Sequence, residues 1–492
     1  MNAHLPALQV VITLIAAPAC ILVRGRDLAF TVALITTWAA FAIACLLLDQ
    51  VMTSGTISYE LGGWAAPWGI EYRVDSLNAF VLLIVSGIAS IVLPFTRSSL
   101  LLEMVGEKAY LFYCAFLLCL TGLLGVAITG DAFNLFVFLE ISSLSSYILI
   151  SLGPHRRALT AAFQYLVVGT IGATFIVIGI GLIYSATGTL NMNDIALRLP
   201  ATGYDRTVIA AFAFLVIGAA IKLALFPLHF WLPKAYTYAP SSVSAFLAAT
   251  ATKVAVYVLI RFLYTVFGVE FSFEILPTAE MLMVLAILAM FVASTIAIFQ
   301  DSVKRMLAYS SVAQIGYMVL GISLVSVGGL TSTILHLFNH ALMKGALFLV
   351  IGCIAYRQSS FRIGDFAGMG RRMPWTMAAF VIGGLSLIGI PLTAGFVSKW
   401  YLILAALDSD LWWLAALIVA SSLLAVIYVW RVIEVAYFKE PPPGLTERKE
   451  APLSLLVPTW VLVAMNVYFG IETSLTVGVA EHAARTLMGV SP

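Results

Sequence analysis

The sequence predicts an all-α integral membrane protein with about fourteen transmembrane helices, two of them broken. Three observations support this fold class. Of 492 residues, 62% are hydrophobic and only 10% are charged, whereas a soluble domain carries roughly 25% charged residues. Apolar runs of the roughly 20 residues that a bilayer core requires recur along most of the chain. Prolines interrupt two of the longest runs.

The predicted spans follow one another with short polar gaps, and no intervening stretch is long enough for a separate soluble domain. The first span lacks a preceding basic stretch and is followed at once by another, so we expect a retained helix and no cleaved signal peptide. The spans fall near 5–23, 28–51, 74–95, 109–129, 131–152, 161–186, 207–226, 241–267, 280–300, 306–326, 330–354, 374–407, 411–438 and 452–470.

Two predicted spans contain a break. The run at 374–407 is too long for one straight helix, and Pro391 predicts an interruption near mid-membrane. Pro227 and Pro233 similarly interrupt the run from 207 to 240. The breaks lie in the seventh and twelfth spans, which are five spans apart. Because each span reverses the direction of the chain across the membrane, an odd separation would make the two units inverted relative to each other. Matching breaks in inverted halves are the usual indication of a transport site.

The distribution of basic residues predicts an orientation in the membrane. With the N-terminus outside, sixteen of the 26 Lys and Arg residues lie in or beside cytoplasmic loops, including a solvated loop at 440–452, and four lie outside. An even number of spans returns the C-terminus to the outside. We therefore expect a multi-pass protein of the cell inner (plasma) membrane with both termini outside.

Composition also excludes several classes of protein. The net charge of +2 and the absence of a basic tract give no indication of nucleic-acid binding. The five cysteines lie in apolar segments at spacings that suggest neither a metal site nor a disulfide framework. Without a cysteine cluster or a phosphate-binding loop, we expect no flavin, iron–sulfur or haem cofactor.

Six basic residues remain inside the predicted spans: Lys222, Lys253, Arg261, Lys344, Lys399 and Arg431. A basic side chain at mid-bilayer costs roughly 2.5–3.5 kcal/mol on insertion scales. The two arginines lie near predicted helix ends, where snorkelling to the surface would explain them. The deep lysines call for another explanation, since a buried lysine can lose its proton and an arginine cannot.

Glu140 is the one carboxylate that we place near the middle of a predicted helix, and serines and a tyrosine follow it at 142–147. A Lys partner would stabilise its ionised form, so we pair Glu140 with Lys222 as a hypothesis. A change in their separation would then alter the protonation of both groups. The alternative is a static salt bridge between two helices.

His336, His340 and Lys344 recur every four residues and so lie on one helical face. The stripe spans about 12 Å, and histidine titrates close to physiological pH, which suits proton relay. Metal binding is the less favoured alternative because no other acid or cysteine is nearby in sequence. The third alternative is that both histidines only pack and form hydrogen bonds with neighbouring helices. Hydroxyl residues could hold water between the charges, namely Ser241, Ser242, Tyr257, Tyr309, Ser310, Ser311 and Tyr317.

These residues resemble a known family, the antiporter-like membrane subunits of respiratory complex I and of the Mrp multi-subunit sodium/proton antiporters. The matching motifs lie within 109–401 and are specific when taken together. They are GDAFNLFVFLE (130–140), KLALFPLH (222–229), WLPKA (231–235), APSSVSA (239–245), QDSVKRMLAYSS (300–311) and the 336–344 stretch. The sequence of residues 130–140 and the chain length are most similar to those of the D-type subunits of the Mrp antiporters.

The resemblance implies two inverted five-helix repeats at 109–267 (helices 4–8) and 280–438 (helices 9–13). Three N-terminal helices at 1–108 precede them, and a loop with helix 14 at 439–492 follows. It also implies a charged axis of Glu140 and Lys222, then Lys253 as the bridge, His336 and His340 as the link, and Lys399 as the terminus. One complex I subunit has glutamate at the position of Lys399, so the lysine disfavours that assignment.

Our first hypothesis is a proton-translocating subunit, not itself an enzyme, of a multi-subunit sodium/proton antiporter. Its partners would be protons, monovalent cations, other membrane subunits and the lipid bilayer. The second hypothesis is a proton-pumping subunit of a redox complex, such as a complex I-like oxidoreductase or a membrane-bound hydrogenase. A stand-alone solute permease is disfavoured because the charges are spread over five helices and do not surround one central pocket.

Overall fold

The predicted spans are present as helices. The structure, a computed structural model, describes residues 4–103, 108–441 and 449–490. Within these ranges, thirteen helices are long and apolar enough to cross a membrane. They are α1 (Leu5–Val23), α2 (Arg26–Ser54), α3 (Ser76–Glu103), α4 (Ala109–Ile128), α5 (Ala132–Ser151), α6 (Arg157–Thr187), α8 (Arg206–Leu223), α10 (Ser241–Ile260), α11 (Thr278–Ile298), α12 (Val303–Ser323), α13 (Val327–Ala355), α17 (Trp412–Phe438) and α18 (Leu453–Ile471).

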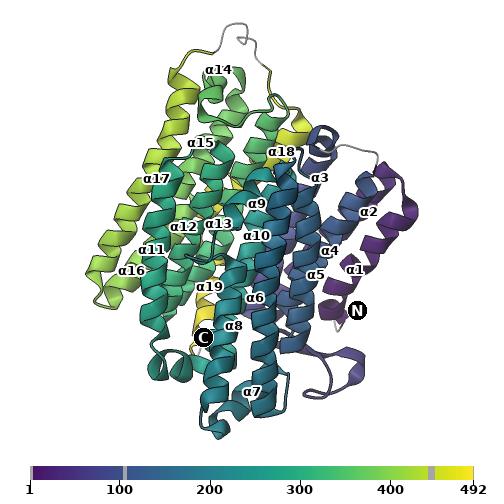
Figure 1. The fold of residues 1–492 in the computed structure, drawn as a ribbon, viewed down its shortest axis with the longest axis vertical. Coiled ribbons are helices and arrows are strands. Elements are labelled where there is room, and N and C mark those ends of the chain that lie inside the picture. The colour runs from purple at the N-terminus through teal and green to yellow at the C-terminus, as the bar shows by residue number, and fades with distance from the viewer. Residues whose placement is uncertain (1–3, 104–107, 442–448, 491–492) are drawn as a thin grey trace.

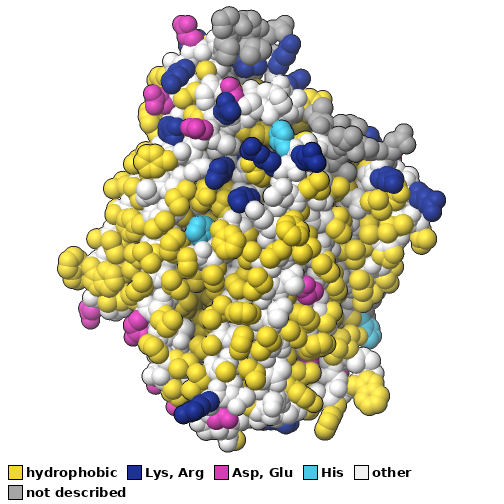
Figure 2. All heavy atoms as spheres, viewed as in Figure 1, with side chains coloured by type: hydrophobic (Ala, Val, Ile, Leu, Met, Phe, Trp, Pro, Cys, Tyr) yellow, Lys and Arg dark blue, Asp and Glu magenta, His cyan; other side chains and the backbone are white. Residues whose placement is uncertain are grey.

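A broken pair of shorter helices, α15 (Pro374–Ile388) and α16 (Ala394–Asp408), occupies the remaining predicted span. The predicted all-α membrane fold with about fourteen spans is therefore confirmed. In Figure 1 the helices form one bundle, with α10 and α13 near its middle. Figure 2 shows hydrophobic side chains covering most of the middle of this face, while basic side chains gather mainly towards one end.

Short elements join the spans, and the sequence analysis anticipated few of them. Strands β1 (Ile57–Glu60) and β2 (Glu71–Val74) pair antiparallel, with Ile57 opposite Val74. We call the end of the bundle that carries this hairpin the hairpin face. The other short helices are α7 (Met192–Arg198), α9 (Leu232–Tyr238), α14 (Met369–Arg372) and α19 (Ser474–Leu487), and π-helical turns η4 (Arg261–Val266) and η5 (Glu270–Ile275) follow α10.

The turn between α4 and α5 lies close to the hairpin. Gly130 donates its backbone N–H to the carbonyl of Glu71 at 2.8 Å. Asp131 then caps α5, because its side chain accepts a hydrogen bond from the backbone N–H of Asn134 at 2.7 Å. Burial raises the pKa of this carboxyl group. The cap fixes where α5 begins and so sets the depth of Glu140 in the bundle.

The break after α8 lies where the prolines predict it. The helix ends at Leu223, and Ala224 takes the left-handed conformation with φ 60°. An irregular segment leads from there to α9, and the indole N–H of Trp231 donates to the carbonyl of Ile221 at 3.1 Å. A side chain thus adds a second hydrogen bond to a carbonyl at the end of the interrupted helix, which also accepts from the backbone N–H of Ala224 at 3.2 Å.

The break between α15 and α16 is also at the predicted place. Gly389 ends α15 with φ 95°, a conformation that favours glycine. The side chain of Asn466 on α18 accepts hydrogen bonds from Ser386 at 2.7 Å and from the backbone N–H of Ala394 at 3.3 Å. A helix outside the broken pair therefore holds the two halves together.

Most of the predicted solvated loop at 440–452, namely residues 442–448, lies outside the described residues.

We predict that Gly395→Ala lowers the free energy of unfolding by about 1–3 kcal/mol, the usual cost of overpacking. A Cβ at this position would overlap the carbonyl oxygen of Ser386 and push α16 away from α15. The melting temperature in detergent measures the effect. Gly181→Ala is the control, because nothing lies within 4 Å of a Cβ there. Equal melting temperatures for the two variants would contradict the close approach.

Candidate functional site

The predicted site residues lie on five helices, α5, α8, α10, α13 and α16. Their side chains are buried, with relative exposures of 6% or less, except for that of Glu140. The buried members are Lys222, Lys253, His336, His340, Lys344 and Lys399. We call these residues, together with Glu140, the buried row.

Glu140 and Lys222 are in direct contact. The Lys222 Nζ donates to Glu140 Oε1 at 3.1 Å and to Ser143 Oγ at 2.8 Å. The lysine side chain is 4% exposed and the glutamate side chain 24% exposed. The row therefore reaches the surface of the isolated bundle at Glu140, and the predicted contact between the two residues is present.

Lys253 lies at the centre of the bundle and is fully buried. Its ammonium group donates to the backbone carbonyl of Ala248 and contacts Thr252 Oγ1 at 3.4 Å. Among the described residues, no carboxylate forms an ion pair with it. Carbonyl and hydroxyl dipoles alone are weaker partners than a carboxylate, which makes Lys253 a group that can give up its proton.

His336 and His340 stack on one face of α13, as their spacing predicts. Their ring centroids lie 5.7 Å apart and the ring planes differ by 5°. His336 has partners on both nitrogens, with Nδ1 lying 2.7 Å from Ser398 Oγ and Nε2 lying 2.9 Å from Gln314 Oε1. Within the described residues, neither ring nitrogen of His340 has a hydrogen-bond partner.

Lys344 continues the α13 stripe one turn beyond His340. Its Nζ donates to the carbonyl of Leu307 at 2.8 Å and to Ser310 Oγ at 2.5 Å, both on α12. One of the predicted hydroxyl groups is thus in contact with the row.

Lys399 lies against the second helix break. Its Nζ donates to the carbonyls of Leu387 and Ile388 at 3.1 and 2.8 Å and to Ser422 Oγ at 3.0 Å. The ammonium group also lies 4.6 Å from the centre of the Tyr317 ring. The interruption of the helix supplies the carbonyl groups that solvate this charge.

The two arginines of the predicted spans differ from each other. Arg431 is partly exposed, contacts the carbonyls of Ile298 and Gln300, and lies 3.6 Å from Asp301, as expected of a side chain that reaches the surface. Snorkelling is the wrong explanation for Arg261, which is 6% exposed. It forms an ion pair with Asp75 at 2.6 Å, a partner that is distant in sequence.

Sequence reasoning missed several polar partners of the row. Gln314 and Ser398 fix the ring of His336, and Ser422 binds Lys399. Single polar residues inside spans more often pack or bond to the backbone, so only their neighbours in space identify them. Ser398 carries the clearest signal in the sequence, because it directly precedes Lys399.

The arrangement is that of a membrane transporter subunit. Ionisable groups extend from α5 to α16 through the interior of the bundle, and each side chain of the row is of a type that can bind and release a proton. Ionisable residues within transmembrane segments typically belong to ion or proton pathways.

The comparisons with known proteins identify the family. Residues 129–425 match the family "NADH:quinone oxidoreductase/Mrp antiporter, TM", and the chain belongs to it. It is 43% identical over 490 residues to the NADH-quinone oxidoreductase N subunit of Desulforudis audaxviator, with 96% of each chain covered. It is 32% identical over 431 residues to the Na(+)/H(+) antiporter D subunit of Alkalihalophilus pseudofirmus, covering 87% of this chain and 85% of the relative.

Solved structures of multi-subunit complexes contain similar chains. One is the Mrp complex from Dietzia sp., with a TM-score of 0.90, 27% identity, and coverage of 99% of this chain and 97% of the other. Another is a membrane-bound sulfane sulfur reductase, an archaeal respiratory membrane complex, with a TM-score of 0.91, 30% identity, and coverage of 99% and 98%. The fold is thus shared by antiporter and respiratory complexes.

We predict that Lys222 and Glu140 are energetically coupled. In a double-mutant cycle, Lys222→Met with Glu140→Gln loses less stability than the sum of the single variants, by about 0.5–3 kcal/mol. Each single variant leaves one charged group without its opposite charge, and the double variant removes both charges. The free energy of unfolding in detergent measures the coupling.

The control is the ion pair of Arg198 and Asp194 on α7, in contact at 2.7 Å, with side chains 45% and 23% exposed. We expect a coupling of only about 0.3–0.5 kcal/mol there. Strict additivity at Lys222 and Glu140 would show that their contact contributes nothing to stability.

Proposed function

We propose that this chain is a proton-translocating subunit of a multi-subunit monovalent cation/proton antiporter, in which the buried row relays protons. The observation that carries the proposal is the ion pair of Lys222 and Glu140 at one end of a row that continues to Lys399. Similarity to the D subunit of a Na(+)/H(+) antiporter supports sodium as the exchanged cation.

In this mechanism, protonation of Glu140 neutralises the carboxylate and weakens its attraction for Lys222. The freed ammonium group then disfavours a second positive charge nearby, so a proton moves onward from Lys253. His340 and His336 accept and release a proton in turn, each imidazole using one nitrogen to accept and the other to donate.

Lys399 receives the proton at the far end. The carbonyl groups of the broken helix and the hydroxyl of Ser422 stabilise its charged form, as 2.8–3.1 Å contacts indicate. Lys344 lies one helical turn from His340, and its charge state changes the electrostatic potential at that imidazole. Two inverted units at 109–267 and 280–438 would give the row its two similar halves, with Lys222 and Lys399 each beside a break.

We place the protein in the plasma membrane with both chain ends outside, following the positive-inside rule. In this orientation the hairpin face is the outer face. The other subunits of the complex would cover Glu140, which is 24% exposed in the isolated chain.

A second candidate function is a proton-pumping subunit of a redox complex. The 43% identity to a subunit of an NADH-quinone oxidoreductase favours it. The relay inside the chain would be the same, and electron transfer elsewhere in the complex would drive it.

We predict that Glu140→Gln abolishes proton transport and leaves assembly intact. Glutamine keeps the shape and part of the hydrogen bonding but can neither ionise nor accept the relayed proton. Proton flux into vesicles containing the native complex measures the effect. Glu434→Gln on α17, an exposed acid outside the row, is the control and should keep normal flux. Full activity of Glu140→Gln would remove the ion pair from the mechanism and so reject the proposed function.

The two candidate functions differ in what drives the flux. We predict that vesicles containing the native complex exchange protons for sodium without NADH, ferredoxin or hydrogen. The complex should purify with small hydrophobic subunits. Flux that depends on a redox substrate, together with co-purifying iron–sulfur proteins, would support the second candidate and reject the first.

A further inference from the structure

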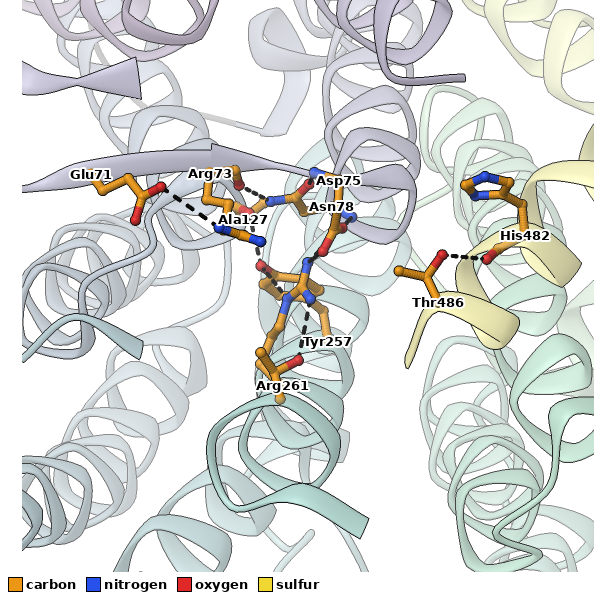
Figure 3. A network of polar contacts seen from close by, with 10 residues as sticks. Glu71, Arg73, Asp75, Asn78, Ala127, Tyr257, Arg261, His482 and Thr486 are labelled. Atoms are coloured by element: carbon orange, nitrogen blue, oxygen red, sulfur yellow. Dashed lines mark hydrogen bonds and ion pairs between the residues drawn. The ribbon is translucent and has the colours of Figure 1, made fainter. Parts of the chain in front are cut away.

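A polar cavity outside the buried row opens at the hairpin face. It has a volume of about 260 Å³ and is lined by Asp75, Asn78, Tyr257, Arg261 and Thr265, among others. Thr486 of α19 contributes from another side. Figure 3 shows Tyr257 and Arg261 extending towards Asp75 and Asn78, which lie where β2 leads into α3.

The guanidinium group of Arg261 is held by three groups around this cavity. Its Nη2 pairs with Asp75 at 2.6 Å, Nε donates to Tyr257 Oη at 3.0 Å, and Nη1 donates to Thr265 Oγ1 at 3.3 Å. Arg261 begins the π-helical turn η4, and such turns occur frequently at functional sites.

Asp75 is the carboxylate of this cavity and is more accessible than its partner. Its side chain is 16% exposed, against 8% for Arg261. It also accepts the backbone N–H of Asn78 at 3.1 Å. Arg261 remains charged whatever the state of its neighbours, so only Asp75 of the pair can take up and release a proton.

The cavity is connected to the row through α10. Lys253, Tyr257 and Arg261 follow one another at intervals of four residues and so lie on one face of the helix. Lys253 and Arg261 are about 12 Å apart along the axis. Tyr257 lies between Lys253 and Arg261 on this face, and its hydroxyl accepts a hydrogen bond from Arg261 Nε at 3.0 Å. It is buried and donates to the carbonyl of Ala127 at 2.9 Å.

We propose that this cavity is the aqueous mouth of a proton path that branches from the buried row at Lys253, with Asp75 as the group that exchanges protons with water. The proposal rests on the proposed function. The flexible stem of Lys253 allows its ammonium group to leave the Ala248 carbonyl and turn towards Tyr257.

The proton balance is simple. Lys253 loses one proton and becomes a neutral amine. The Tyr257 hydroxyl and the water that the polar cavity admits pass one proton on to the carboxylate of Asp75. Protonated Asp75 loses its attraction for Arg261, gives its proton to water in the cavity and then pairs with Arg261 again.

The first test measures driven proton flux in vesicles containing the assembled complex with Tyr257→Phe or Asp75→Asn. We expect each variant to lower flux at least about tenfold, because a relay group is lost. Tyr264→Phe is the matched control. Tyr264 lines the same cavity and donates to the carbonyl of Ile322 at 2.8 Å, but it lacks a contact with Arg261 among the described residues. Its flux should stay within about twofold of the unchanged chain.

The second test examines access to the cavity. Thr265→Cys, in a chain whose five native cysteines are replaced, should react with a membrane-impermeant thiol reagent added at the hairpin face, and the labelled complex should lose its flux. Ser359→Cys, which lines a groove that also contains Arg362 and Asp365, should react only from the opposite side. Because Thr265 accepts a hydrogen bond from Arg261, the flux of the labelled complex is compared with that of unlabelled Thr265→Cys.

The outcomes separate the two proposals. Active Glu140→Gln would reject the proposed function itself. With Glu140→Gln inactive, full flux through assembled Tyr257→Phe and Asp75→Asn would reject the mouth and leave the function standing. Failure of Thr265→Cys to react from the hairpin face would also reject the proposed mouth.

Discussion

The interior of this bundle is organised by the need to solvate positive charge away from water. Burying an unpaired charge costs far more than the marginal stability of a protein can support. Each lysine of the row is therefore met by oxygen atoms from the chain itself. The oxygen source differs at the two ends, with a carboxylate and a serine at Lys222 and carbonyls of a broken helix at Lys399.

This difference gives the ends different chemistry. A carboxylate can change its own charge, so the environment of Lys222 is adjustable. Carbonyl dipoles are permanent, so the environment of Lys399 is fixed as long as the break keeps its shape. The shape is held by Asn466, which bridges Ser386 and the first residue of α16. Helix α18 therefore contributes to the site without carrying a member of the row.

The fold followed from the sequence because its signals are long and local. Spans of about 20 apolar residues are hard to mistake, and proline marks both breaks. The contact of Lys222 with Glu140 was also predictable, since few other partners could stabilise either group. The hairpin, α19 and the partners of His336 were not. Short polar segments lack a strong period, and Gln314, Ser398 and Asp75 become informative only when their neighbours in space are known.

The stacked imidazoles of His336 and His340 have a consequence for how many protons the link can hold. At 5.7 Å between ring centroids, two simultaneous positive charges would repel each other by about 3 kcal/mol at an effective dielectric of 20. Protonation of the second ring would then be about a hundredfold less favourable than if the two rings did not interact. If protons pass along the row, the proposed function would therefore move them through this pair one at a time.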